Sequence, residues 1–304
     1  MASLSRRSRG YGQSMAWRSI ADLLGDEGEV ALLGAPMEAG SVTPGRCDLA
    51  PETVRRTLKR ISTYDLDTGV DLDVLRVHDL GDVPVKGVSP AAGFDAIREA
   101  VSAATARHAL TLLVGGNNAV TRPAAHGLNL PLDRVGLITL DAHFDMRETD
   151  QGPMNGNPVR CLLEDGMPGR NMVQIGLAPF ANTAKMHEDA LAAGIGCFGM
   201  FEVLEDGIQP ILDHALARLG HVEALMVDFD IDVIDRAQLP GAPGARPGGM
   251  PGHMFFEAAR ILAMRPQVRL VDLTELDPSL DVSDISALTA ARWVAEVLMG
   301  YAMR

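Results

Sequence analysis

The stretch Leu137-Ile138-Thr139-Leu140-Asp141-Ala142-His143-Phe144-Asp145 changes abruptly from an apolar run to two carboxylates and an imidazole. Its β-branched, apolar first half is typical of a buried strand. In an open α/β sheet, ligands bind beyond the carboxyl ends of the strands. Asp and His side chains with no neighbouring Cys favour Mn, Ni, Zn or Fe over a metal that prefers thiolate. We therefore interpret Asp141, His143 and Asp145 as one half of a metal site.

A second acidic cluster follows another apolar run, residues 224–229. Because side chains alternate along a strand, Asp228, Asp230 and Asp232 are expected to point the same way. Like charges on one buried face repel each other unless a cation neutralises them or they take up protons. Either acidic cluster alone fits a solvated turn that caps a helix equally well. The two together favour a shared metal site.

Two further polar segments directly follow predicted strands. Glu275 follows the apolar run 268–273 and could orient a substrate cation or a leaving group, although it also fits an ordinary helix-start carboxylate. Gly115-Gly116-Asn117-Asn118 follows the run 110–114. Two glycines allow a tight turn and a close backbone approach, but a glycine turn is a weak signal by itself.

The rest of the chain alternates short apolar runs with amphipathic segments, which favours one doubly wound α/β domain with a mostly parallel sheet of about eight strands. We assign this domain to residues 29–304. Ser89-Pro90 is typical of a helix start, and helical stripes are also expected near residues 208–219 and 288–298. The predicted strands are residues 30–33, 75–79, 110–114, 135–140, 172–176, 195–198, 224–229 and 268–273.

Composition excludes some classes of protein. A net charge of −13 argues against nucleic acid or an anionic membrane as the main partner. No apolar run approaches the ~18 residues needed to cross a bilayer. The 3 cysteines are far apart in sequence, which suits a reducing, cytoplasmic location. Residues 1–28 are expected to form an exposed or oligomer-contacting arm.

Two segments rich in glycine and proline, residues 34–51 and 239–252, interrupt the alternation of strands and helices. Such segments can be flexible linkers. Because each follows directly on a strand end, we interpret them as shaped active-site loops. Arg246 in the second loop could bind a substrate carboxylate through two parallel hydrogen bonds, or it could form a salt bridge at a subunit interface.

The order of these motifs resembles that of the ureohydrolase family, which includes arginase, agmatinase and formiminoglutamase. The resemblance also covers the segments 34–36, 50–55 and 79–83. It implies an arginase-like three-layer αβα fold with a binuclear Mn or Ni site. In that family a metal-bridging hydroxide attacks a guanidino or formimino carbon and releases urea or formamide together with an amine. The family usually assembles as trimers or hexamers.

Carried over by position, the resemblance also implies roles for single residues. Glu275 matches the acidic residue that faces the substrate's guanidinium, and Glu275 and Asp145 are the candidate catalytic residues. Asp141 and Asp230 would bridge the two metals. The residues that match metal ligands are Asp141, His143, Asp145, Asp230 and Asp232.

The chain departs from the family pattern at two positions. Asn118 stands where the family has a histidine metal ligand, and an amide oxygen is a neutral, weak ligand. Asn155 stands where several branches carry a histidine, and asparagine cannot shuttle protons near pH 7. Asn155, the nearby Asn157 and Arg246 are the candidate substrate-binding residues.

Three hypotheses follow from these departures. The first, which we favour, is a subunit impaired at one metal site that supports an intact paralogous subunit in a hetero-oligomer acting on a guanidino or biguanide compound, as in the nickel-dependent metformin hydrolases. The second is a self-sufficient hydrolase like agmatinase or formiminoglutamase, with a modified or mononuclear metal site. The third is a metal-free structural or binding protein. The expected cofactor is accordingly one or two Ni or Mn ions, or none in this chain.

Overall fold

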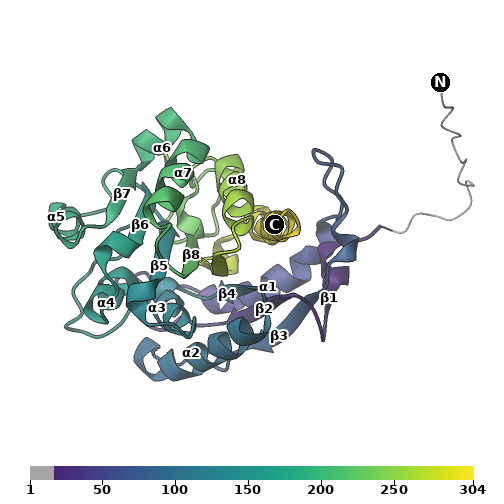
Figure 1. The fold of residues 1–304 in the computed structure, drawn as a ribbon, viewed down its shortest axis with the longest axis horizontal. Helices are drawn as coiled ribbons and strands as arrows, with labels where there is room; N and C mark the ends of the chain where they lie inside the picture. The colour runs from purple at the N-terminus through teal and green to yellow at the C-terminus, as the bar shows by residue number, and fades with distance from the viewer. Residues whose placement is uncertain (1–16) are drawn as a thin grey trace, which may run out of the picture.

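The computed structural model describes residues 17–304, and all the strands in that part of the chain lie in one parallel sheet (Figure 1). The strand order is β1-β3-β2-β4-β9-β8-β5-β6-β7. Every pair of neighbouring strands in this sheet is parallel, as expected for strands that alternate with helices. The strands are β1 (Leu24–Gly25), β2 (Val30–Ala35), β3 (Val77–Asp82), β4 (Leu110–Gly115), β5 (Val135–Leu140), β6 (Met172–Leu177), β7 (Gly196–Gly199), β8 (Ala224–Asp230) and β9 (Val268–Thr274).

Helices cover both faces of this sheet and complete the three layers (Figure 1). Helices α1, α6, α7, α8 and α9 pack along one face, and α2, α3 and α4 pack along the other. The helices are α1 (Ala50–Thr57), α2 (Pro90–Arg107), α3 (Thr121–His126), α4 (Pro158–Glu164), α5 (Ala184–Ala193), α6 (Met200–Asp206), α7 (Ile208–Arg218), α8 (Gly252–Ala263) and α9 (Ile285–Ala302).

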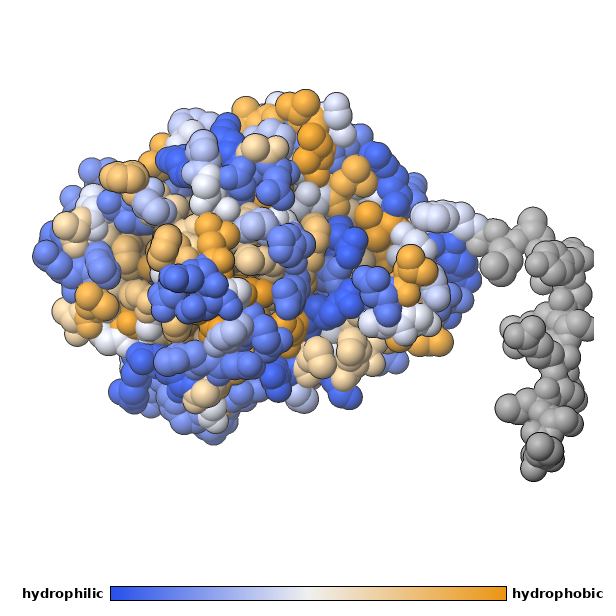
Figure 2. Space-filling view, turned by 90° about the horizontal axis from the view of Figure 1, so that it is seen from above, coloured by the Kyte–Doolittle hydropathy of each residue, from blue (hydrophilic) through white to orange (hydrophobic). Residues whose placement is uncertain are grey.

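Each face of the sheet has its own hydrophobic core. Strands β2, β4, β5, β6 and β8 are buried along their whole length, because helices cover both of their faces. On one face, the ring of Phe229 makes edge contacts with Phe255 and Trp293, each at 5.4 Å between ring centres. Hydrophobic side chains on the outer surface lie interspersed among hydrophilic ones (Figure 2). No helix within residues 17–304 is both long enough and apolar enough to cross a membrane.

The predicted fold class is confirmed, and all eight predicted strands are present with ends that differ by up to three residues. The predicted start of α2 is also confirmed, because the Ser89 side chain accepts a hydrogen bond from the amide of Ala92. The ninth strand, β1, was not predicted because a strand of two residues is too short to show an alternation of hydrophobic and polar side chains. Of the expected N-terminal arm, residues 1–16 lie outside the described residues. Ile20 and Leu23 are buried in the core, and β1 pairs with β3.

The order of the central strands places the acidic motifs side by side. Strands β4, β9, β8 and β5 are consecutive neighbours, although β4 and β5 precede β8 and β9 by more than 80 residues in the chain. Because the strands are parallel, their carboxyl ends lie at one edge of the sheet. The segments that carry Asn118, Glu275, Asp230 and Asp141 therefore begin from the same edge.

Candidate metal centre

Three side chains from the ends of β5 and β8 form a compact group of metal-binding type. Asp141, His143 and Asp232 each offer one ligand atom, and these atoms lie within 4.8 Å of one another. The Nδ1 atom of His143 is 3.3 Å from Asp141 Oδ1 and 3.1 Å from Asp232 Oδ2. The two acidic motifs predicted from the sequence therefore meet in space.

Local backbone geometry aims these side chains at one point. Asp141 Oδ1 accepts a hydrogen bond from the backbone amide of His143, and Asp230 Oδ1 accepts one from the amide of Asp232. Each carboxylate thus stabilises the turn directly after its own strand. Asp145 and Glu275 adopt positive φ values of 52° and 63°, a region uncommon for residues with side chains. Such backbone strain is typical of functional sites.

Three carboxyl groups at this site, those of Asp141, Asp145 and Asp230, resist ionisation when no cation is present. Burial raises the pKa of Asp141 to about 6, and repulsion from Asp232 adds to this effect. Burial and the charges of Asp232 and Asp141 raise the pKa of Asp230 well above its ordinary value. The pKa of Asp145 is raised in the same way, by burial and by Asp141. A divalent cation would offset these repulsions.

His143 neutralises part of this charge in the metal-free protein. The negative charge of Asp232 is the largest of the effects that raise the pKa of His143 to about 12. Burial would raise the pKa of Asp232, but the imidazolium outweighs burial and holds that pKa below its ordinary value. His143 would have to release this proton in order to serve as a metal ligand.

Glu275 lies beside this cluster and is held by two asparagines. Its Oε1 atom accepts hydrogen bonds from the Asn118 backbone amide at 2.7 Å and from Asn155 Nδ2 at 3.0 Å. Burial raises the pKa of Glu275 to about 7, while these two hydrogen bonds act in the opposite direction. Asn155, predicted to bind substrate, lines the cavity and also positions Glu275.

The Asn118 amide faces the cluster with its nitrogen. Asn118 Nδ2 donates to Asp145 Oδ2 at 2.7 Å, and Asn118 Oδ1 accepts from the hydroxyl of Thr121 at 2.5 Å. To serve as a metal ligand, the amide would have to turn so that its oxygen faces the carboxylates. In the arrangement seen here Asn118 acts as a hydrogen-bond donor to Asp145.

A second pair of acids is buried directly below the cluster. Asp228 of β8 is paired in register with Asp272 of β9, and both are fully buried. Burial and the charge of Asp272 raise the pKa of Asp228 well above its ordinary value, and burial raises that of Asp272 to about 7. A proton on one of the two carboxyls relieves the repulsion between them. Asp228 therefore shares a strand face with Asp230 as predicted, but it lies within the sheet and does not line the cavity.

A cavity of about 130 Å³ opens above the acidic cluster. Both loops that were expected to shape an active site contribute to its lining, through residues such as Val42 and Gly244, and the segment that contains Asn155 and Gly156 adds to it. Position 244 requires glycine because the backbone there passes close to the side chain of Asp232. A Cβ atom at this position would lie 1.9 Å from Asp232 Oδ2. The loop 239–252 therefore folds directly over the candidate metal ligands.

Two of the three predicted substrate-binding residues line the cavity, and the third does not. Asn155 and Arg246 are lining residues. The expectation that Asn157 contacts substrate does not fit the structure, because its amide nitrogen donates to the carbonyls of Glu148 and Gly152 and its oxygen accepts from the Met154 amide. Asn157 thus stabilises its own loop.

Sequence reasoning missed several residues at this site. Arg147 and Asn182 line the cavity, and Asn182 bonds the backbone of Ala142 and Phe144 on either side of His143. The hydroxyl of Thr121 contacts both Asn118 Oδ1 and Asp272 Oδ2, and so it orients the Asn118 amide from the side of the sheet. Arg147 could have been noticed because it follows Asp145 by two residues, whereas the other contacts depend on tertiary structure.

The donor set suits a divalent metal of the Mn type. Asp141, His143, Asp230 and Asp232 offer carboxylate oxygens and one imidazole, which such metals accept. The buried carboxylates are in excess of the one cationic imidazole among them, and this imbalance is what a bound cation would correct.

Comparisons with known proteins identify relatives along almost the whole chain. A model of the arginase family matches residues 28–300. The formimidoylglutamase of Halalkalibacterium halodurans is 31% identical over 274 residues, which are 88% of this chain and 86% of that protein. The guanidinopropionase of Pseudomonas aeruginosa is 31% identical over 288 residues, which are 89% and 86% of the two proteins.

Solved structures agree with these sequence matches. Formimidoylglutamase from Bacillus subtilis has a TM-score of 0.89 and 26% identity to this chain, covering 98% of this chain and 96% of its own. Trypanosoma cruzi formiminoglutamase with Mn²⁺ has a TM-score of 0.84 at 24% identity, covering 91% and 94%. The similarity to the Trypanosoma cruzi enzyme, at 24% identity, is a similarity of fold alone.

Proposed function

The chain belongs to the arginase family and is an amidine hydrolase that acts on C–N bonds other than peptide bonds, and we propose that its substrate carries a formimino group, which is released as formamide. The observation that carries this proposal is the convergence of Asp141, His143 and Asp232 on one point, with Asp230 and Glu275 beside them in the lining of the cavity. Several formimidoylglutamases among the relatives support the formimino group over other amidines.

We further propose that Asp141, His143, Asp230 and Asp232 hold a divalent metal, with Mn²⁺ favoured because a formiminoglutamase of the same fold is known with Mn²⁺. When bound, such an ion supplies Lewis acidity and makes a nucleophilic water available at neutral pH. His143 would hold the ion as a neutral imidazole, without the proton that it carries in the absence of metal. Asp145, held by Asn118, is then placed to hold a proton of the attacking water.

Glu275 has the complementary role toward the substrate. A formimino group is a planar cation at neutral pH, and its N–H groups match the oxygens of a carboxylate. Glu275 can offer this carboxylate because Asn118 and Asn155 hold it against the cavity. Glu275 stays ionised and holds the amidinium, and the proton that Asp145 takes from the attacking water can then pass to the departing amine.

A guanidino substrate is the second candidate, favoured by the likeness to guanidinopropionase. The two candidates differ in product, because a guanidino compound gives urea. Biguanides, nickel and pairing with an intact paralogous subunit stay predictions, as does assembly into a trimer or hexamer. The hetero-oligomer hypothesis requires that the chain be inactive alone.

The test is an assay of the chain expressed alone, stripped of metal with a chelator and reloaded with Mn²⁺ or Ni²⁺. Formamide release from formimino compounds is expected, with faster turnover than urea release from guanidino compounds. An Asp230→Asn variant is expected to lose metal binding and activity together. Urea as the main product would favour the second candidate, and activity that appears only with a co-expressed paralogue would favour the hetero-oligomer.

A further inference from the structure

We propose that Asn182 is a positioning residue for the metal ligand His143, and that its side chain serves the metal site and not the substrate, although it lines the cavity. This inference rests on the proposed metal site. It gives a role to the segment 178–183, which joins β6 to α5 and to which the sequence assigned none.

The Asn182 side chain holds both peptide groups that adjoin His143. Its Nδ2 atom donates to the carbonyl of Ala142 at 2.9 Å, and its Oδ1 atom accepts from the amide of Phe144 at 2.9 Å. The carbonyl belongs to the peptide group before His143, and the amide belongs to the one after it. Because peptide groups are planar, fixing both of them fixes φ and ψ of His143 and with them the direction of its side chain.

The imidazole of His143 depends on this support because few other groups orient it. A quarter of the His143 side chain is exposed. Within residues 17–304 its ring forms polar contacts through Nδ1 alone, and these contacts are to Asp141 and Asp232, which are themselves candidate ligands. Histidine ligands are usually oriented by a hydrogen bond from their second ring nitrogen. In this chain the orientation of the ring is determined from the backbone, and therefore by Asn182.

The two hydrogen bonds of Asn182 are not equally replaceable. The carbonyl of Ala142 also accepts from the amide of Ala178 at 2.9 Å, so it keeps a donor when Asn182 is removed. The amide of Phe144, a buried residue, has Asn182 as its one partner among the described residues. Loss of the Asn182 side chain therefore releases the peptide group that follows His143 and leaves a buried N–H unpaired.

The same contacts use up the donors of Asn182. Its Nδ2 atom has two N–H groups, and the second lies 3.4 Å from the carbonyl of Ala178. Both donors are thus directed at the backbone of the protein. Asn182 has no N–H left to offer a substrate, although it lies in the wall of the cavity.

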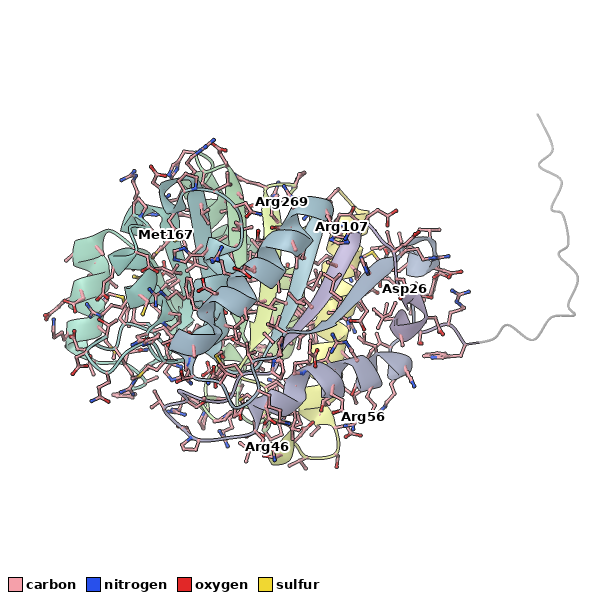
Figure 3. All side chains as sticks on the ribbon, turned by 90° about the horizontal axis from the view of Figure 1, so that it is seen from below. Asp26, Arg46, Arg56, Arg107, Met167 and Arg269 are labelled. Carbon is pink, nitrogen blue, oxygen red and sulfur yellow. The ribbon has the colours of Figure 1, made fainter. Side chains whose placement is uncertain are left out.

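Asn171 provides a matched control, because it holds the other end of β5 in a similar way. Its Nδ2 atom donates to the carbonyls of Asp133 and Val135, each at 3.0 Å. Asn171 is buried and directly precedes β6, so it lies at the amino end of the strands. Arg269, at the start of β9, marks this end in Figure 3, and Arg46, in a loop that folds toward the cavity, lies at the opposite end.

The test measures the Mn²⁺ affinity of Asn182→Ala and Asn171→Ala by competition with a fluorescent chelator. Asn182→Ala is expected to bind Mn²⁺ about 10- to 100-fold more weakly, the usual effect of removing a partner behind a metal ligand. Asn171→Ala is expected to stay within about twofold of the native affinity. Thermal melting in the presence of chelator verifies that each variant folds. If Asn182→Ala does not fold, Asn182→Ser replaces it with the same expectation, because serine offers one polar atom in place of two.

Kinetics separate a positioning role from substrate binding. When Mn²⁺ is raised until Asn182→Ala is saturated, most of its activity should return, and KM for the formimino substrate should stay within about twofold of the native value. A substrate-binding residue would instead show a raised KM at native Mn²⁺ affinity.

Native Mn²⁺ affinity in the Asn182 variant, an equal loss of affinity in Asn171→Ala, or a raised KM at native affinity would each overturn the positioning role and leave the proposed function standing. A native chain that binds no Mn²⁺ or other divalent metal would overturn the proposed metal site, and this inference with it.

Discussion

The side-chain nitrogen of Asn118 donates a hydrogen bond to Asp145 Oδ2 at 2.7 Å, within a cluster that otherwise lacks donors for that carboxylate. This contact makes Asn118 a stabilising partner of a buried acid in the metal-free protein. It also means that the amide has to turn before its oxygen can reach a metal. The hydroxyl of Thr121, which now donates to Asn118 Oδ1, would then have to donate elsewhere, and Asp272 Oδ2 lies 3.0 Å away.

The first prediction concerns Asn118→His. An imidazole is a stronger ligand than an amide oxygen, so we expect the variant to bind Mn²⁺ at least about tenfold more tightly. Competition with a fluorescent chelator measures this affinity directly, without an activity assay. Asn118→Leu serves as the contrast, because it removes both the hydrogen bond and any ligand and should weaken metal binding. An Asn118→His variant with native or weaker affinity would show that position 118 does not face the metal.

The second prediction concerns the stability of the metal-free protein against pH. The folded protein raises the pKa of Asp141 to about 6, Glu275 to about 7 and His143 to about 12. A group with a raised pKa binds its proton more tightly when folded. Its stabilising contribution is complete below the unfolded value and is lost as the pH rises through the folded value.

The two carboxyls therefore lose their contributions between about pH 4 and pH 7, and His143 begins to lose its own above about pH 6.5. We expect the free energy of unfolding to fall by on the order of 6 kcal/mol from pH 5 to pH 8. Urea denaturation in the presence of a chelator measures the decrease. Mn²⁺ should stabilise the protein much more at pH 8 than at pH 5, because its ligands must be deprotonated. A free energy of unfolding that does not change with pH in the absence of metal would contradict these raised pKa values.

Much of this architecture could be predicted from the sequence, because the strands are long apolar runs and the acidic motifs follow them directly. Eight strands and the clusters around Asp141 and Asp230 required no knowledge of tertiary structure. The neighbour order of the strands did require it, since β9 and β8 insert between β4 and β5. That order is what brings Asn118 and Glu275 beside the two acidic clusters.

What could not be predicted depends on the paths of the loops. Asn155 was expected to contact substrate, and only the fold shows that its amide also holds Glu275. Asn157, two residues later, has its amide bonded within its own loop, a difference that the local sequence does not reveal. Arg147 and Asn182 reach the cavity from loops whose shapes are determined by packing against the rest of the protein.

The third prediction concerns Gly244→Ala. The new methyl group would lie 1.9 Å from Asp232 Oδ2 and 3.1 Å from His143 Cε1, so the loop or these side chains must move. We expect kcat/KM to fall at least about 100-fold, because small displacements of catalytic groups have effects of that size. Mn²⁺ affinity should fall as well. Gly252→Ala, at the end of the same loop, is the control, since its methyl group would make only an ordinary contact with Gln238. Equal activity of the two variants would contradict the close approach.

The fourth prediction concerns the pH dependence of Asn155→Ala. The hydrogen bond from Asn155 Nδ2 stabilises the ionised form of Glu275 and therefore lowers its pKa. Its removal should raise that pKa by about one unit, since hydrogen bonds to charged groups contribute about 1.5–3 kcal/mol. If ionised Glu275 holds the amidinium, the acidic limb of the kcat/KM profile has to move to higher pH by a similar amount. At pH 7 the variant should lose about fivefold in kcat/KM and recover most of it at pH 8.5. Glu275→Gln provides the reference, because it should remove the same limb altogether, and an Asn155→Ala profile parallel to the native one would assign the titrating group to another residue.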